Sequence, residues 1–101
     1  MNAMNRSVVV DLIRQAVYAA CEQAGEPLPL DQITETTRLF GSQGVLDSMG
    51  LTTVIVDVEQ EINDRFGLAI TLADERAMSQ KSSPFRSVQS LADYILTLVE
   101  G

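Results

Sequence analysis

The sequence predicts an all-α fold, a small bundle of three main helices and one short helix with a long first loop. Three observations support this prediction. Apolar residues recur with helical periodicity in three separate segments. Prolines and threonines interrupt the chain between the first two segments, and hydrophobic residues make up 46% of the 101 residues, which is enough for one core. We therefore treat residues 1–101 as a single domain.

The first helix is expected from about Ser7 to Ala24, after a flexible start at residues 1–6. Ser7 is a candidate N-cap and Gly25 a candidate stop. At about 100° per residue the apolar side chains share one face: Val9, Leu12, Ile13, Ala16, Val17, Ala20 and Ala24. Cys21 lies at the edge of this face, so we interpret it as a small, partly buried residue and not as a redox site.

Residues 25–46 are expected to form a long loop across the surface of the bundle. Pro27 and Pro29 oppose a helix, and the threonines and glycines that follow favour turns. A loop of this length is usually functional or held by its own apolar residues. Such anchors are present: Leu28, Leu30, Ile33, Leu39, Phe40, Val45 and Leu46.

The second helix is expected over residues 48–66, with Gly67 as its stop. Its buried stripe consists of Leu51, Val54, Ile55, Val58, Ile62 and Phe66. Residues 68–72 alternate in polarity but have no pairing partner nearby, so we predict an extended connector. A short helix at 74–80 and a loop at 81–86 follow. The last helix is expected over 87–100, with one apolar face: Val88, Leu91, Ala92, Ile95 and Val99.

Charge and missing residue types exclude several classes of function. The net charge of -7 argues against nucleic acids and anionic membranes. It favours partners with basic docking faces, although acidity that only maintains solubility is an alternative. The chain has no histidine, and we predict neither catalytic residues nor a metal site. One cysteine allows no internal disulfide, and no apolar run is long enough to span a bilayer. We expect a cytoplasmic monomer without membrane insertion.

The most informative stretch is residues 44–51, where the long loop becomes an amphipathic helix. Ser48 lies at the helix start, where unpaired N–H groups and a partial positive charge suit a phosphate ester on the serine oxygen. Asp47 precedes it with a carboxylate that can hold a divalent metal together with a phosphate-bearing substrate. Serine and aspartate are also ordinary N-caps, so the spacing alone leaves a purely structural cap open.

Residues 46–49, Leu-Asp-Ser-Met, resemble the Asp-Ser-Leu signature of acyl carrier proteins, with methionine in place of leucine. Residues 39–40, 51–66 and 87–95 resemble other parts of that family. The resemblance implies that a phosphopantetheinyl transferase attaches 4′-phosphopantetheine from coenzyme A to Ser48, with Asp47 in docking or metal contact. The thiol of this arm, and not Cys21, would hold acyl groups as thioesters. Acyl-activating or acyl-transferring enzymes of fatty acid, polyketide or specialised lipid biosynthesis would use them, and the protein itself would not be an enzyme.

In that family, exposed positions on the second helix contact partner enzymes. By resemblance, the candidate partner contacts are Met49, Thr53, Val56, Asp57, Glu59 and Gln60. Asp57, Glu61 and Asp64 form an acidic row about one turn apart, for which a merely solvated face is the alternative. Gly50 weakens the first turn, and the close approach of a partner backbone is one explanation.

Two departures from the family indicate a dedicated carrier. The second helix is about one turn longer than usual, and the segment 74–86 is longer and contains Arg76, Lys81 and Arg86. This segment is either a solvated loop, a specialised docking surface or an altered wall of an acyl pocket.

Two other functions stay open, an aminoacyl carrier similar to D-alanyl carrier proteins and a helical interaction module with an unmodified serine. An apolar interior would permit burial of the cargo, formed by Val54, Val58, Ile62 and Ile95.

Overall fold

The structure is a computed structural model that describes residues 5–39, 44–72 and 86–100, without the side chains of Ser48 and Glu100. Within these ranges the chain forms three α-helices and a single 3₁₀ turn: α1 (Arg6–Gln23), η1 (Leu30–Gln32), α2 (Ser48–Phe66) and α4 (Val88–Glu100). The predicted all-α fold is therefore confirmed. The short helix expected at 74–80, the cations Arg76 and Lys81 and the anchor Phe40 lie outside the described residues.

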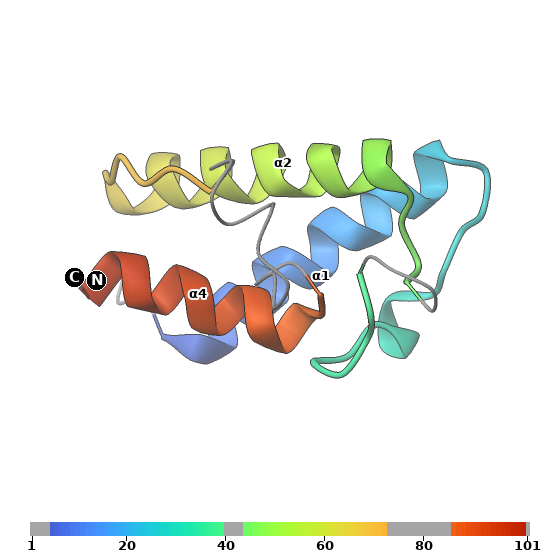
Figure 1. Ribbon diagram of the computed structural model, residues 1–101, viewed down its shortest axis with the longest axis horizontal. Helices are drawn as coiled ribbons and strands as arrows, with labels where there is room; N and C mark the ends of the chain where they lie inside the picture. The colour runs from blue at the N-terminus through green and yellow to red at the C-terminus, as the bar shows by residue number, and fades with distance from the viewer. Residues whose placement is uncertain (1–4, 40–43, 73–85, 101) are drawn as a thin grey trace.

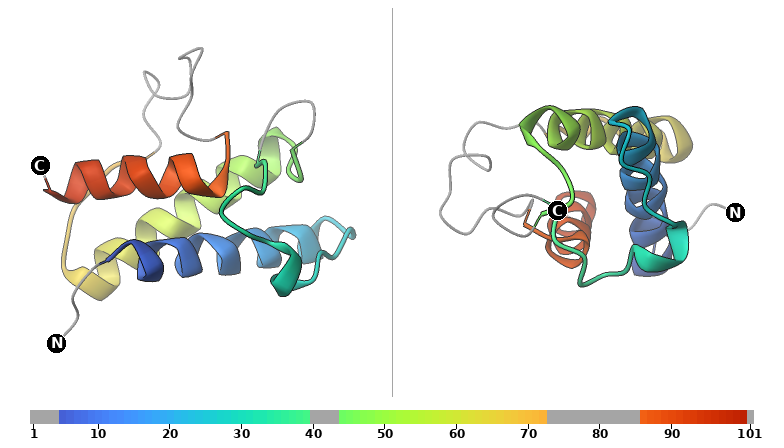
Figure 2. Two further views of the ribbon diagram at one scale, coloured as in Figure 1. Left: turned by 90° about the horizontal axis from the view of Figure 1, so that it is seen from below. Right: turned by 90° about the vertical axis from the view of Figure 1, so that its right-hand side faces the viewer.

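α1 is the central helix of the bundle, because both α2 and α4 pack against it. In Figure 1, α2 and α4 run from right to left, whereas α1 runs in the opposite direction behind them. The end-on view in Figure 2 shows the three helices around one common interior. The predicted apolar faces of all three helices meet in one core, whose largest fully buried side chains include Ile13, Val17, Val54, Ile55, Ile62, Leu91 and Ile95.

The start of α1 differs from the prediction. Asn5, and not Ser7, is the N-cap, and its side chain accepts a hydrogen bond from the N–H of Val8 at 3.0 Å. Asparagine caps a helix as well as serine does. The helix therefore begins two residues earlier than it would with Ser7 as its cap. Arg6 is the first helical residue, so the expected flexible start does not extend to Asn5 and Arg6. Residues 1–4 lie outside the described part.

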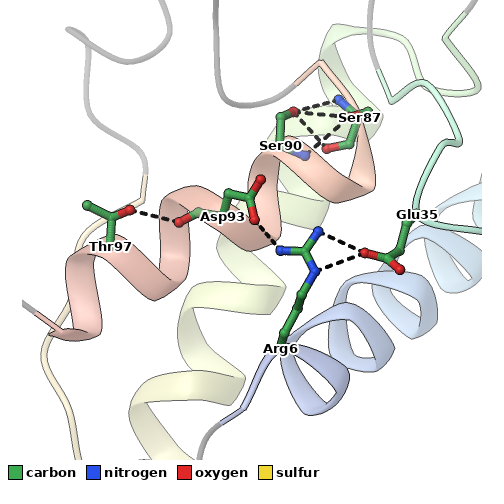
Figure 3. A network of polar contacts seen from close by, with 6 residues as sticks. All are labelled: Arg6, Glu35, Ser87, Ser90, Asp93 and Thr97. Carbon is green, nitrogen blue, oxygen red and sulfur yellow. Dashed lines mark hydrogen bonds and ion pairs between the residues drawn. The ribbon is translucent and has the colours of Figure 1, made fainter.

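Arg6 joins the start of α1 to the long loop and to α4 (Figure 3). Its guanidinium group forms ion pairs with Glu35, at 2.8 Å, and with Asp93. These hydrogen bonds, the one to Asp93 above all, raise the pKa of Arg6 above its ordinary value. Because the three residues come from segments far apart in the sequence, this contact ties one end of the bundle together.

Cys21 is more buried than the sequence suggested, with 3% of its surface exposed. Burial raises the pKa of its thiol, and the nearby carboxylate of Glu26 adds to the effect. The thiol therefore stays protonated near neutral pH, which makes it a poor nucleophile. Cys21 is therefore a core residue, whereas the sequence suggested only partial burial. None of the helices in the described part has the length and apolar character needed to cross a membrane.

A short ladder of backbone hydrogen bonds connects three distant segments beside the start of α2. The N–H of Leu39 donates to the carbonyl of Arg86 at 2.8 Å, and the N–H of Leu46 donates to the carbonyl of Leu39 at 2.9 Å. The first pairing belongs to an antiparallel bridge between Arg38 and Ser87. Leu39 is fully buried, as its predicted role as an anchor requires. The ladder therefore fixes the chain that leads into α2.

The C-terminal end of α2 is fixed by Asn63. Gly67 adopts a left-handed conformation, with φ of 63°, and donates its N–H to the carbonyl of Asn63. The side chain of Asn63 then binds both backbone groups of Ile70, accepting from its N–H at 2.9 Å and donating to its carbonyl at 3.2 Å. Residues 68–72 form neither helix nor strand, so the prediction of a connector in place of a strand is confirmed.

The start of α4 is a reciprocal cap formed by Ser87 and Ser90 (Figure 3). The hydroxyl of Ser87 accepts from the N–H of Ser90 at 3.2 Å, and the hydroxyl of Ser90 accepts from the N–H of Ser87 at 3.0 Å. This is the geometry of a capping box, with serine in place of the usual glutamate at the third helical position. The helix itself begins at Val88, one residue after the predicted start at 87.

Candidate functional site

Ser48 is the first residue of α2, and Asp47 is its N-cap. The Oδ1 atom of Asp47 accepts a hydrogen bond from the N–H of Gly50 at 2.7 Å, which satisfies one of the unpaired donors at the helix start. The predicted boundary at residues 48–66 is confirmed. The side chain of Ser48 lies outside the described part, whereas its backbone position at the loop-to-helix junction is defined.

Gly50 has an explanation within the chain. A Cβ atom at this position would lie 3.2 Å from Oδ1 of Asp47 and 3.3 Å from Cδ2 of Leu46, which is tighter than most such contacts. Leu46 is anchored in the core with 8% of its surface exposed. The glycine therefore makes room for the cap and for this anchor. The approach of a partner backbone, which the sequence suggested, is not needed to explain it.

The residues on both sides of Ser48 lie at the surface. Asp47 is exposed, and Met49 is exposed to 79%, far more than Leu30, the other exposed large apolar residue of the described part. The hydroxyl of Thr53 donates to the carbonyl of Met49 at 3.0 Å, so the first turn carries an additional constraint. An enzyme can thus approach this junction, and a phosphate ester on Ser48 would fit at a helix start with solvent on both flanks.

Most of the predicted partner contacts share the outer face of α2. Met49, Thr53, Val56 and Gln60 follow one another at intervals of three or four residues, and Asp57 is exposed beside them. Thr53 and Val56 are half-buried, whereas Gln60 is exposed. We call Met49, Thr53, Val56 and Gln60 the outer strip. It offers a partner one large apolar side chain surrounded by smaller and polar groups.

Glu59 does not belong to the outer strip. It is half-buried, and its Oε1 atom accepts a hydrogen bond from the N–H of Leu72 at 3.3 Å. Because Glu59 lies beside the buried stripe of α2 and not in it, the sequence suggested an exposed side chain. The connector 68–72, however, folds back along this flank of α2. The carboxylate therefore supports the connector, and we omit Glu59 from the docking surface.

The predicted acidic row lies on the other flank of α2, facing α1. Asp57, Glu61 and Asp64 line a groove between the two helices together with Gln15, Ala16 and Gln60, the last residue of the outer strip. The carboxylate of Glu61 is paired with Arg65 at 3.0 Å. Among the described side chains, no group of three or more histidine, cysteine, aspartate or glutamate residues is arranged to hold a metal ion.

The predicted interior is filled by side chains. Val54, Val58, Ile62 and Ile95 are each 0–1% exposed and belong to the common core. Entry of a cargo between them would require these close-packed side chains to move apart. Burial of a cargo in this interior stays a prediction.

Comparisons of the chain with protein-family models, with curated proteins and with solved structures found no match.

Proposed function

We propose that this protein is an acyl carrier protein whose working residue is Ser48, modified with 4′-phosphopantetheine. The observation that carries the proposal is the position of Ser48 as first residue of α2, between the exposed residues Asp47 and Met49. The similarity of residues 46–49 to the carrier signature supports it. A helical bundle with a long first loop is also the fold that this resemblance implies.

Helix-start geometry favours this modification in two ways. The partial positive charge at the N-terminus of α2 stabilises a phosphate group attached there. The cap from Asp47 to Gly50 keeps the junction in one conformation, so the serine is presented to the modifying enzyme at a fixed place. Asp47 thus acts as a positioning residue for Ser48, in addition to any contact with the magnesium ion of the transferase.

The attachment step is a transfer of phosphopantetheine from coenzyme A. The Oγ atom of Ser48 would attack the pyrophosphate phosphorus that bears pantetheine, and adenosine 3′,5′-bisphosphate would leave with the electrons of the broken P–O bond. The transferase would supply the base that takes the hydroxyl proton. When bound, the arm supplies a thiol that holds an acyl group as a thioester. The tether raises the local concentration of that group at a partner enzyme.

The outer strip and Asp57 provide the docking surface of this carrier. Met49 offers an apolar anchor directly after Ser48, and the net charge of -7 attracts enzymes with basic faces. The single buried thiol agrees with a reducing compartment, in which we place the protein as a cytoplasmic monomer. The chain performs no chemistry on its cargo in this proposal.

Intact mass spectrometry tests the modification. The purified chain is incubated with coenzyme A, magnesium and a promiscuous phosphopantetheinyl transferase, and one phosphopantetheine should be added. Ser48→Ala should abolish the mass gain, whereas Ser7→Ala, at an exposed serine inside α1, should leave it intact. Asp47→Asn keeps a capping side chain but removes the charge. It should slow the reaction without unfolding the protein, as judged by circular dichroism.

An unmodified wild-type chain, under conditions in which an established carrier is fully modified, would contradict the proposal and favour the interaction module. The cargo is tested separately on the modified protein. Acyl-activating and aminoacyl-activating enzymes are each offered, and thioester formation is followed by mass. We expect acyl loading. Exclusive aminoacyl loading would contradict the acyl carrier proposal and favour the aminoacyl carrier.

A further inference from the structure

Two arginines stand apart from the other described cations. Arg6, Arg14 and Arg65 each form an ion pair with a carboxylate of the same chain. Arg38 and Arg86 form no ion pair with any residue in the described ranges, and both are exposed. The chain has twice as many acidic as basic residues, yet these two cations are paired with none of the described carboxylates.

Arg38 and Arg86 line the same notch, which has a volume of about 350 Å³. The backbone ladder brings their segments together, because the antiparallel bridge pairs Arg38 with Ser87, the residue that follows Arg86 in the chain. Every described residue that lines the notch is polar. Thr36 contributes a hydroxyl, which is hydrogen-bonded to that of Thr34 at 3.0 Å, and Gln89 contributes an amide. The notch therefore suits a compact, charged group and not an apolar one.

The other charged elements around the notch are already engaged. The N–H of Val88 donates to the carbonyl of Thr37, and the N–H of Gln89 donates to that of Glu35 at 2.8 Å, so the start of α4 keeps no free donor here. Asp93, the acidic residue of the lining, is paired with Arg6. The guanidinium groups of Arg38 and Arg86 are therefore what the notch presents to a ligand.

We propose that this notch binds the phosphate group of a small phosphate monoester. A guanidinium group pairs in a bidentate manner with phosphate or carboxylate oxygens. One carboxylate satisfies a single guanidinium group, whereas a dianionic phosphate has oxygens and charge for two. Two guanidinium groups with a hydroxyl and an amide beside them thus favour the phosphate. This binding is independent of the proposed modification of Ser48.

Nuclear magnetic resonance titration of the full chain with inorganic phosphate tests the inference. At constant ionic strength, the Nε–H signals of Arg38 and Arg86 should shift in a saturable manner, and those of Arg65 should not. Acetate should give at least tenfold weaker binding. Glycerol 3-phosphate, a small monoester, should bind as inorganic phosphate does. Lowering the pH until the probe is a monoanion should weaken the binding.

Substitutions complete the test. The double substitution Arg38→Gln with Arg86→Gln should abolish saturation, and Arg65→Gln, which removes an exposed guanidinium group outside the notch, should preserve it. Ser48→Ala should bind phosphate like the wild type, so failure of the notch and failure of the carrier function are distinguishable. Equal shifts with chloride or acetate would overturn the inference. So would saturation that survives the double substitution, or binding of inorganic phosphate without binding of the monoester.

Discussion

The N–H of Gly50 donates to Oδ1 of Asp47 at 2.7 Å, and a methyl group on Gly50 would lie 3.2 Å from that same oxygen. The cap and the glycine therefore belong together. Glycine costs a helix interior about 1 kcal/mol relative to alanine, and loss of an aspartate cap costs a similar amount, typically about 1 kcal/mol. The cap that glycine makes room for offsets the poor helix propensity of glycine at this position.

A double-mutant cycle measures this coupling. Gly50→Ala alone should change the free energy of unfolding by less than about 0.5 kcal/mol, because the gain in helix propensity is cancelled by strain on the cap. In the Asp47→Ala background the same substitution should be more favourable by up to about 1 kcal/mol, since the carboxylate is gone and only the contact with Leu46 opposes the gain in helix propensity. Urea denaturation gives each value, and strictly additive effects would show that the two residues are not coupled.

Asn63→Ala should destabilise the protein by about 2 kcal/mol, because both backbone groups of Ile70 lose their partner in a half-buried place. Asn63→Asp keeps the acceptor and loses the donor, so it should fall between alanine and the wild type. Gln60→Ala, at an exposed position on the same helix, is the matched control and should have almost no effect. Equal midpoints for Asn63→Ala and Gln60→Ala in urea would contradict the role of Asn63.

The capping box of α4 predicts non-additive behaviour. Ser87→Ala and Ser90→Ala should each reduce the free energy of unfolding by about 1 kcal/mol. The double substitution should cost clearly less than the sum, because either change already breaks the reciprocal pair. Ser7→Ala, inside α1, serves as control and should leave the denaturation midpoint unchanged.

The raised pKa of Cys21 predicts a loss of stability in alkaline solution. In the unfolded chain the thiol ionises near its ordinary value of 9.0, whereas in the folded protein it remains protonated to higher pH. Above that value the unfolded state binds fewer protons than the folded state, so stability falls as the pH rises. Urea denaturation at pH 7.5 and pH 10 should show a smaller decrease for Cys21→Ala than for the wild type. An identical decrease in both proteins would show that ionisation of Cys21 does not contribute to the loss of stability.

Met49→Gln tests the outer strip without disturbing the core. Since Met49 is 79% exposed, the free energy of unfolding should change by less than about 0.5 kcal/mol. The rate of modification by the transferase should fall several-fold, because the apolar anchor beside Ser48 is lost. Leu30→Gln, at an exposed apolar residue in η1 outside the strip, is the control and should leave the rate unchanged. Equal rates for the wild type and Met49→Gln would remove Met49 from the docking surface.

The helices were predictable because their signals are local. The apolar stripe of α2 and the glycine at its end are contained in twenty consecutive residues, and the structure confirms both. The contacts that the sequence did not reveal join distant residues. Arg6 and Asp93 pair across most of the chain, and Glu59 meets a backbone group that only the reversal at Gly67 brings near. Periodicity contains no information about such pairings.

The exposure of Met49 was also predictable, because it depends on a local signal. Among the partner contacts named from the resemblance, the outer strip lies on the side of α2 opposite its buried stripe, and helical periodicity alone defines that side. The hydrogen bond of Glu59 depends on the path of residues 68–72, which helical periodicity does not describe. The notch of Arg38 and Arg86 likewise depends on the ladder between segments about fifty residues apart, so sequence patterns did not reveal it.

The ladder that joins residues 37–39 to 45–46 and 86–88 also sets an order of events during folding. The pairing of Leu39 with Leu46 closes a short loop, whereas the pairing of Leu39 with Arg86 closes a loop of about 50 residues and has a higher entropic cost. The long closure is thus expected late, after α1 and α2 have docked. The junction at Ser48 would then reach its final geometry before α4 locks the bundle.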